Sequence, residues 1–479
     1  MSRAWFKRLT VLVSVLAIIG NVYIFTYPSL NPQKCSWRCA SQKVSIDATD
    51  ALPLVEKAAI KARQYVDDVW SQIGPKRKVE RSSRKGLPSD VHLLALGDPQ
   101  IKGIWKSTPY MSRLDTYGND YYLGHIFRMM KKRLKPSHVA VMGDLFSSQW
   151  IGDSEFYNRT MRYTSRIFQR NTTWLQDILK HSHDASGLYT VDWTAFADDL
   201  GERLKKDPKE FEFGYSDVKS WDSANDDYLF INLTGNHDVG YSGDATYQHM
   251  ARFQELFGKD NYWVEYDRDT EHPWRIVVLN SMLLEGPALQ PQLMEKTWEF
   301  LYRLFEQRFE GSTVLLTHVP FYKTPGLCAD EELFRYYPSD YEREPYKQNL
   351  LRSQNHLSQD ATKRVLNLIF DNNKPGVILT GHDHEGCETW YNKDSKSGDW
   401  TASKTVQAST DLHIREITVR SMMGEFDGNA GLLTGHFNPR TKLWEWSFSL
   451  CPFSIQHVWW FTKVVTILSG LFWSILVLV

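Results

Sequence analysis

The chain has 479 residues, which is enough for one large domain or two ordinary ones. Its 56 basic and 57 acidic residues leave a net charge of -1, and its pI is near 7.0. We therefore expect no nucleic-acid partner, since such a partner usually requires a basic excess. The shares of hydrophobic residues (42%) and charged residues (24%) are those of a folded protein.

The first feature in chain order is an almost wholly apolar stretch at 9–27, which Asn21 alone interrupts with a strongly polar side chain. Its length matches the roughly 20 apolar residues that a membrane-spanning helix needs. No small-x-small cleavage site follows it, so we expect an uncleaved transmembrane signal anchor in place of a cleaved signal peptide. Three basic residues precede the stretch and place the tail, residues 1–8, in the cytosol.

A second apolar stretch closes the chain at 458–479. Apolar residues surround this expected helix on all sides, which is typical of a span in contact with lipid. Trp459 and Trp460 suit a membrane interface, and Lys463 can reach it. We predict a lumenal stalk at 28–90 and a lumenal domain at 91–457, held to one membrane at both ends.

Five apolar runs in this domain end directly before polar side chains. Such a run predicts a buried strand that stops at a tight turn and places chemistry at its carboxyl end. The runs are 91–96, 139–142, 228–233, 314–317 and 377–380, and the residues after them are Gly97-Asp98-Pro99-Gln100, Gly143-Asp144, Gly235-Asn236-His237-Asp238, His318 and Gly381-His382-Asp383-His384.

The intervals between these runs contain helical and strand patterns. Helices are predicted at 121–134, 161–179, 193–205, 293–309 and 361–370, and strands at 276–279, 405–408, 416–421, 431–437 and 443–450. The interval 146–227 is predicted to be an insertion that covers or borders the site, and the polar segment 328–360 a surface loop region. Together the elements predict an α/β sandwich of two central sheets flanked by helices.

Two further signals agree with a secretory compartment. Asn158 and Asn171 begin glycosylation acceptor triplets in polar surroundings, whereas the triplet at Asn232 lies in a predicted strand and is expected to be unused. The chain has five cysteines, so at least one is unpaired. Cys35, Cys39 and Cys451 lie near a span: one pair could join the two membrane-proximal ends, or Cys35 could pair with Cys39.

The polar residues at the strand ends have the composition of a metal site. They are carboxylates, carboxamides and imidazoles without cysteine. This ligand set suits divalent ions such as Mn, Fe or Zn, whereas a structural zinc site would be built from cysteine thiolates. Two such ions about 3.5–4 Å apart, bridged by a carboxylate, form a site for attack at phosphorus. A single Gly-Asp or Thr-His would be weak evidence, but five strand ends in this order make coincidence implausible.

The ordered set resembles the calcineurin-like metallophosphoesterase superfamily, whose motifs are Asp-x-His, Gly-Asp, Gly-Asn-His-Asp/Glu, a single His and Gly-His-x-His. The match covers roughly 91–450, with Gln100 in place of the first His. The resemblance implies a sandwich of two mixed β-sheets flanked by helices and a dinuclear centre. One metal would be held by Asp98, Gln100, Asp144 and His384, and the second by Asp144, Asn236, His318 and His382. His237 would protonate the leaving oxygen, and Asp238 would orient the His237 ring.

Gly97-Asp98-Pro99-Gln100, the two spans and the stretch 416–426 resemble a narrower group, the phosphoesterases that remodel GPI anchors in the endoplasmic reticulum. That resemblance implies Mn as the metal and removal of ethanolamine phosphate from a mannose of the glycan, the second favoured over the first. The partners would be GPI-anchored proteins, the bilayer and the ER-export cargo machinery. The alternatives are a lumenal phosphatase or nucleotide phosphodiesterase and a non-catalytic GPI-cargo receptor.

Overall fold

The structure, a computed structural model, describes residues 3–37, 87–105, 107–182, 193–207, 210–216, 227–328, 333–394, 396–407 and 410–478, with a few separate positions between 55 and 70. Most of the predicted stalk at 28–90 therefore lies outside the described residues. The helices are α1 (Arg3–Leu30), α3 (Tyr110–Leu134), α4 (Asp153–Arg162), α5 (Thr173–Ser182), α6 (Trp193–Lys206), α7 (Asn236–Val239), α8 (Tyr247–Phe257), α9 (Pro291–Glu306), α10 (Gln359–Ile369) and α11 (Gln456–Leu478).

The described strands form two mixed sheets and a separate pair. The first sheet has the order β15 (Leu443–Pro452), β14 (Asn429–Asn438), β1 (Val91–Leu96), β2 (His138–Val141) and β4 (Leu229–Asn232). The second has the order β12 (Trp400–Ser403), β11 (Cys387–Asp394), β13 (Thr410–Thr418), β10 (Gly376–Thr380), β7 (Ser312–Thr317), β6 (Trp274–Leu279), β5 (Tyr262–Tyr266) and β3 (Gly214–Ser216). The pair is β8 (Phe334–Tyr336) with β9 (Leu351–Gln354).

The two sheets pack face to face because their strands are apolar on both sides. In β1, Leu93 and Ala95 join an apolar cluster with residues of β6, β7 and β10, which is the interior of the sandwich. The alternate residues Leu94 and Leu96 join a second cluster with side chains of the surrounding helices. Successive side chains of a strand point to opposite faces, so a strand buried on both faces reads as an unbroken apolar run. The predicted sandwich of two mixed sheets flanked by helices is confirmed.

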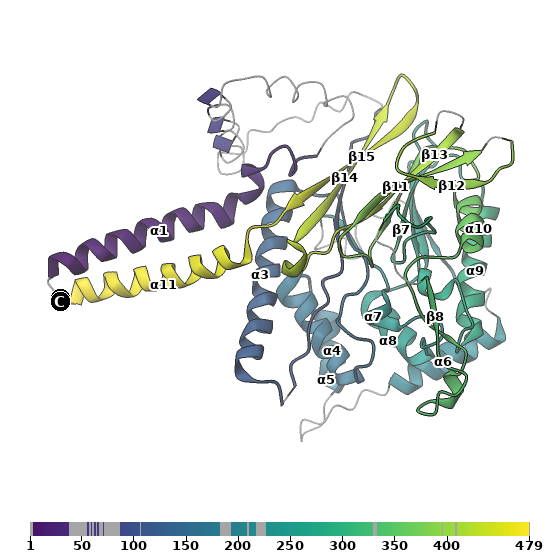
Figure 1. The fold of residues 1–479 in the computed structure, drawn as a ribbon, viewed down its shortest axis with the longest axis horizontal. Helices are drawn as coiled ribbons and strands as arrows, with labels where there is room; N and C mark the ends of the chain where they lie inside the picture. The colour runs from purple at the N-terminus through teal and green to yellow at the C-terminus, as the bar shows by residue number, and fades with distance from the viewer. Residues whose placement is uncertain are drawn as a thin grey trace.

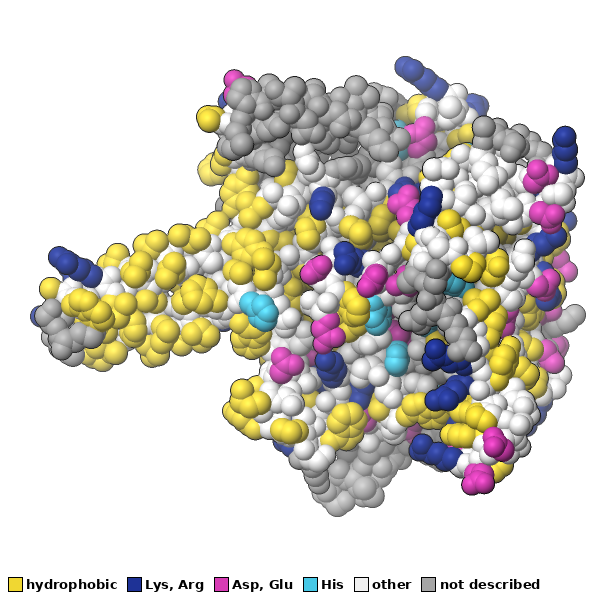
Figure 2. All heavy atoms as spheres, in the orientation of Figure 1, with side chains coloured by type: hydrophobic (Ala, Val, Ile, Leu, Met, Phe, Trp, Pro, Cys, Tyr) yellow, Lys and Arg dark blue, Asp and Glu magenta, His cyan; other side chains and the backbone are white. Residues whose placement is uncertain are grey.

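Helices α1 and α11 lie side by side and project together from the sandwich (Figure 1). Both are long and apolar enough to cross a membrane, and hydrophobic side chains cover the visible surface of the projecting pair (Figure 2). Their contact carries polar groups: Asn21 donates to Thr466 at 2.9 Å, and the hydroxyls of Ser14 and Ser469 are 2.8 Å apart. Hydrogen bonds of this kind hold helices together where lipid supplies no hydrophobic drive.

A disulfide at the base of this hairpin decides between the two cysteine pairings left open by the sequence. Cys35 is bonded to Cys451, the next-to-last residue of β15, and so joins the two membrane-proximal segments. A second disulfide, Cys328 with Cys387, was not predicted. It ties the loop that follows β7 to the first residue of β11.

Several predicted elements differ from the structure. The helix predicted at 121–134 begins already at Tyr110, and the strand predicted at 416–421 spans Thr410–Thr418. Residues 405–407 form no strand, because β12 ends at Ser403 and β13 begins at Thr410. The helix predicted over 161–179 is broken: α4 passes into a π-helical turn, η3 (Tyr163–Ile167), and α5 begins only at Thr173. The segment 328–360, predicted as a surface loop region, contains the strand pair β8 and β9, whose few alternating residues gave no period-two signal.

Candidate metal centre

The predicted site residues follow strands whose carboxyl ends meet at one edge of the sandwich. Strands β1, β2 and β4 run parallel in the first sheet, and β7 and β10 run parallel in the second. Parallel strands place their carboxyl ends together, so the turns after them converge. The residues at these turns are Asp98 and Gln100 after β1, Asp144 after β2, Asn236, His237 and Asp238 after β4, His318 after β7, and His382 and His384 after β10.

Four of these residues have left-handed backbone conformations. The φ angles are 39° at Asp98, 41° at Gln100, 47° at Asp144 and 73° at His382. Residues other than glycine adopt positive φ rarely and at a cost of about 1–3 kcal/mol, and such positions gather at functional sites. The turns therefore hold these side chains in orientations that relaxed loops would not adopt.

The first predicted ligand set comes together in the structure. Nε2 of Gln100 lies 3.2 Å from Oδ2 of Asp144 and 3.2 Å from Nε2 of His384. Nε2 of His384 in turn lies 3.5 Å from Oδ2 of Asp98. Turning the Gln100 amide over would put its oxygen where its nitrogen now lies, facing the same two partners. A glutamine oxygen can thus take the place of the imidazole that the motif normally supplies.

The second set also comes together, and Asp144 belongs to both. Nε2 of His318 lies 3.4 Å from Oδ1 of Asp144 and 3.2 Å from Oδ1 of Asn236. Nδ1 of His382 lies 3.0 Å from the same oxygen of Asn236. One oxygen of Asp144 thus faces the first set and the other oxygen faces the second, which is the placement required of a bridging carboxylate.

Backbone carbonyls fix which nitrogen of each ring is free to bind a metal. Nδ1 of His318 lies 2.7 Å from the carbonyl oxygen of Met142, and Nε2 of His382 lies 3.1 Å from that of Gln354. A carbonyl only accepts, so these two nitrogens carry the protons. The opposite nitrogens present lone pairs to Asn236, as is usual where a protein orients its metal-binding histidines.

The electrostatics of the site fit a bound cation. Burial lowers the pKa of His382 to about 3 and also lowers that of His318, so both rings are neutral near pH 7. The free Nε2 of His318 then faces a carboxylate oxygen of Asp144 at 3.4 Å with no proton between them. Such converging acceptors repel one another unless a positive ion lies among them.

Asp98 gives a second indication of a cation. Its carboxylate is fully buried, and its Oδ1 has no hydrogen-bond partner among the described residues. Burial and the neighbouring Asp144 raise the pKa of Asp98. His, Cys, Asp and Glu side chains alone form no metal-holding group of three or more in the described part of the chain. The amides of Gln100 and Asn236 complete the two sets, and the residues fit a pair of divalent ions.

His237 lies at the edge of the site with its side chain about one-third exposed (35%). Its backbone N–H donates to Oδ1 of Asp144 at 2.8 Å, and its ring Nε2 lies 3.8 Å from Oδ2 of the same residue. Nδ1 is buried and has no hydrogen-bond partner within the described residues. A ring beside the bridging carboxylate, open to solvent on one side, is placed to exchange a proton with a substrate.

The structure gives Asp238 a role different from the predicted orientation of His237. Its buried carboxylate accepts three backbone hydrogen bonds, from Gly235 at 2.9 Å, Phe146 at 3.1 Å and Leu145 at 3.2 Å. These bonds join the turn after β2 to the turn after β4. Asp238 therefore positions the segment that carries Asp144, because both of its oxygens are used by that framework.

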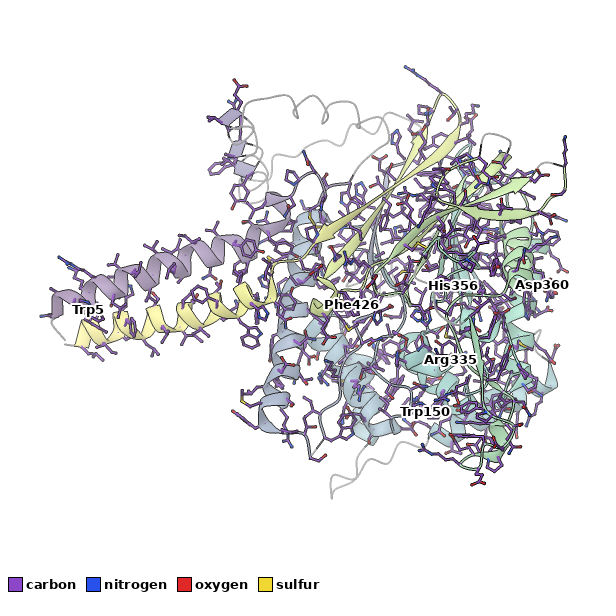
Figure 3. All side chains as sticks on the ribbon, viewed as in Figure 1. Trp5, Trp150, Arg335, His356, Asp360 and Phe426 are labelled. Carbon is purple, nitrogen blue, oxygen red and sulfur yellow. A yellow bond between two sulfur atoms is a disulfide. The ribbon has the colours of Figure 1, made fainter. Side chains whose placement is uncertain are left out.

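Two contacts of the site were not predicted. Gln354 of β9 holds His382 through a backbone carbonyl, which no side-chain pattern reports. Phe426 packs edge-on against His384, with ring centroids 4.6 Å apart, and lies on the side of the sandwich nearest the base of the hairpin (Figure 3). Phe426 belongs to the stretch 416–426, on which the narrower resemblance partly rests. The sequence therefore marks this residue but does not indicate its contact with His384.

Comparisons with known proteins agree with this geometry. The chain is 55% identical over 487 aligned residues to Protein TED1 of Saccharomyces cerevisiae, and the alignment covers all of both chains. It is 25% identical over 325 residues to Metallophosphoesterase 1 of Danio rerio, covering 64% of each chain. It is 28% identical over 185 residues to Metallophosphoesterase 1 of Xenopus laevis, covering 34% of this chain and 42% of the relative.

No protein-family model matches the chain. Among solved structures, the 5'-nucleotidase precursor of Thermus thermophilus aligns with 80% of this chain and 58% of its own, at 12% identity and a TM-score of 0.29. A similarity at this TM-score identifies neither the fold nor the function of the chain.

Proposed function

This chain belongs to the calcineurin-like metallophosphoesterases and is a metal-dependent phosphoesterase, and from that premise we propose that it acts on the GPI-anchor glycan. The proposed reaction removes ethanolamine phosphate from a mannose, the second favoured over the first. The motif Gly97-Asp98-Pro99-Gln100 and the stretch 416–426 support this narrower assignment through their resemblance to the GPI-remodelling phosphoesterases.

The observation that carries the proposal is the short path from the metal centre to the membrane hairpin. Phe426 contacts His384 of the centre. In the same loop, Gly424 packs so closely on Gln456 that an added side-chain carbon would lie 2.6 Å from its Oε1. Gln456 is the first residue of α11. A centre one loop away from the membrane suits a phosphodiester carried on a lipid-anchored glycan better than a freely diffusing substrate.

Two bound divalent ions, proposed to be Mn, would supply an activated water and neutralise charge on the phosphoryl oxygens. The protein's own contribution is to hold Asp144 between the two ligand sets and to keep the rings of His318 and His382 neutral and oriented. His237 would donate a proton to the mannose oxygen as the phosphodiester bond breaks, because it is the ring beside Asp144 with a solvent-exposed side.

A polar cavity of about 660 Å³ supports a glycan substrate. Its lining combines aromatic rings with charged and amide groups: Gln149, Trp150, Asp244, Tyr337, Tyr341, Arg343, Glu344 and Arg352. Arg352 is two residues before Gln354, whose carbonyl holds His382, so β9 joins the cavity to the metal centre. Aromatic faces and hydrogen-bonding side chains are the groups that bind sugars, and arginines can bind their phosphates.

The compartment follows from the same proposal. The domain would lie in the lumen of the endoplasmic reticulum, with both termini cytosolic, because α1 and α11 run side by side and their free ends meet at the tip of the hairpin (Figure 1). Asn158 and Asn171, both exposed, would then be glycosylated. GPI-anchored proteins would be its substrates, and the ER-export machinery would receive the remodelled cargo.

The test uses the full-length protein in detergent with Mn and a GPI-anchored protein that carries ethanolamine phosphate side branches. Mass spectrometry follows the loss of the branches, with Asp144→Asn as the matched control. We expect loss with the native protein alone, and the fragment masses identify the mannose. Two bound metals without loss would favour another phosphoester, such as a nucleotide diester. Neither metal nor loss would favour the GPI-cargo receptor.

A further inference from the structure

Helix α3 begins with an apolar face that the described residues leave largely exposed, apart from Arg166, which stacks on Tyr117 and Tyr121. Tyr110 and Met111 are each 73% exposed, and Leu114, Tyr117 and Tyr121 are 46%, 43% and 50% exposed. Their spacing of three or four residues places them on neighbouring turns of one side of the helix. Trp105, 51% exposed, lies in the loop just before the helix. Hydrophobic side chains gather at the edge of the domain where α3 begins (Figure 2).

This helix lies directly against the base of the membrane hairpin. Gly118 packs on Trp460 of α11 so closely that an added side-chain carbon would meet the indole ring. Further along α3, Tyr122 donates to the carbonyl of Ser454 at 2.6 Å, and His125 bonds to the carbonyl of Ile24 in α1 at 2.8 Å. The residues at 118, 122 and 125 define the side of α3 that faces the hairpin.

Met111 and Leu114 continue this hairpin-facing side beyond the end of the contact, whereas Tyr110, Tyr117 and Tyr121 lie about a quarter turn away around the helix. Met111 is seven residues before Gly118, which is two helical turns, so it lies on the same side. Leu114 lies on the adjacent flank of that side. Figure 1 shows α3 running across the base of the hairpin, transverse to α1 and α11. A helix transverse to two membrane spans runs along the membrane surface.

We propose that the first half of α3, together with Trp105, rests on the lumenal face of the same bilayer that α1 and α11 cross. The partner is lipid because Met111 and Leu114 continue the helix side that meets the spans, and the exposed tyrosines flank them, a combination typical of interfacial helices. This inference rests on the proposed membrane embedding and deepens the proposed function.

The contact would fix how the metal centre faces the membrane. The domain is packed on the hairpin, so the two spans alone would let the whole protein tilt in the bilayer, whereas a further contact at α3 sets its orientation. Only the loop 101–109 separates Gln100 of the centre from Tyr110, so the apolar face and the site belong to one continuous segment. The substrate's own anchor lies in that bilayer, and the docked α3 would hold the centre at the height of the glycan.

A lipid-quenching measurement tests the docking without relying on activity. Leu114→Cys, in a full-length chain with Cys39→Ser, is labelled with an environment-sensitive fluorophore and reconstituted into nanodiscs that contain spin-labelled lipid. Tyr336→Cys, at a comparable exposure of 49% in β8, is the matched control. We expect quenching and a blue shift at position 114 and neither at 336. Equal signals at the two positions would overturn the proposal.

Activity then tests the consequence. We expect the double variant Met111→Glu and Leu114→Glu to turn over a lipid-embedded phosphodiester at least tenfold more slowly while retaining its rate on a small soluble phosphodiester. Tyr336→Glu should change neither rate. An equal loss on both substrates would contradict membrane orientation as the role of α3. Quenching at position 114 without any GPI-glycan activity would refute the proposed substrate and leave the docking standing.

Discussion

Asp238→Asn separates the role that the resemblance implies for this residue from the role that the structure assigns. In the structure both oxygens of the Asp238 carboxylate are used, since they accept backbone N–H groups of Gly235, Leu145 and Phe146. An asparagine keeps one oxygen and turns an NH₂ group toward at least one of these donors. Because the residue is fully buried, water cannot replace the lost acceptor.

The magnitude follows from these three bonds. One lost hydrogen bond to a charged acceptor costs about 1.5–3 kcal/mol, and the remaining bonds become weaker because the acceptor is neutral. Burial and the nearby Asp144 raise the pKa of Asp238, so losing its charge recovers part of the cost. We expect a net destabilisation of about 3 kcal/mol, which lowers the melting temperature of a domain of this size by roughly 4 °C.

The assay combines thermal unfolding of the full-length protein with hydrogen exchange by mass spectrometry. We expect faster exchange of the amides of Leu145 and Phe146 in Asp238→Asn, because their acceptor is lost. Asp394→Asn is the matched control: Asp394 also accepts two backbone N–H groups, from Lys396 and Ser397, but is only partly buried. Unchanged stability and exchange in Asp238→Asn, with an altered pH profile of turnover, would refute the positioning role and restore the orientation of His237.

Three further outcomes are expected. His237→Ala should bind metal as the native protein does, by calorimetry, while turnover falls about 10²–10⁴-fold; loss of metal would instead make His237 a ligand. Gln100→His should bind its metal at least tenfold more tightly, since imidazole is the better ligand; unchanged affinity would mean that Gln100 does not bind it. Burial lowers the pKa of His138 to about 3, below its value of about 6.5 in the unfolded chain. The free energy of unfolding is therefore highest above pH 6.5 and falls by up to about 1.4 kcal/mol per pH unit as the pH decreases toward 3, because the unfolded chain takes up a proton at His138. In thermal unfolding at a series of pH values, His138→Asn should flatten this dependence.

Much of the site could be predicted from the sequence because the relevant signals are local. A buried strand is an unbroken apolar run, and the turn that ends it needs Gly or a short polar residue. Gly143-Asp144 and Gly381-His382 therefore mark strand ends without any knowledge of the tertiary structure. The two terminal spans are likewise marked by length and composition. Both signals lie within a few consecutive residues.

The later strands show where local signals fail. β15 alternates over a full strand length and was predicted, whereas β12 has four residues and β8 has three, which is too short for a period to appear. The break of the predicted helix 161–179 at η3 also has no local signal. The hydroxyl of Tyr163 in that turn bonds to the side chain of Asn232 in β4, so a partner 69 residues away holds it.

Only the tertiary structure decided how the parts of the site divide their work. The sequence by itself determined which residue types gather at the strand ends, because that depends on neighbours along the chain. It could not tell that Asp238 uses its carboxylate on backbone N–H groups, that Gln354 orients His382 through a carbonyl, or that Cys35 pairs with Cys451 instead of Cys39. These contacts join segments far apart in the chain, and their geometry exists only once the two sheets have packed.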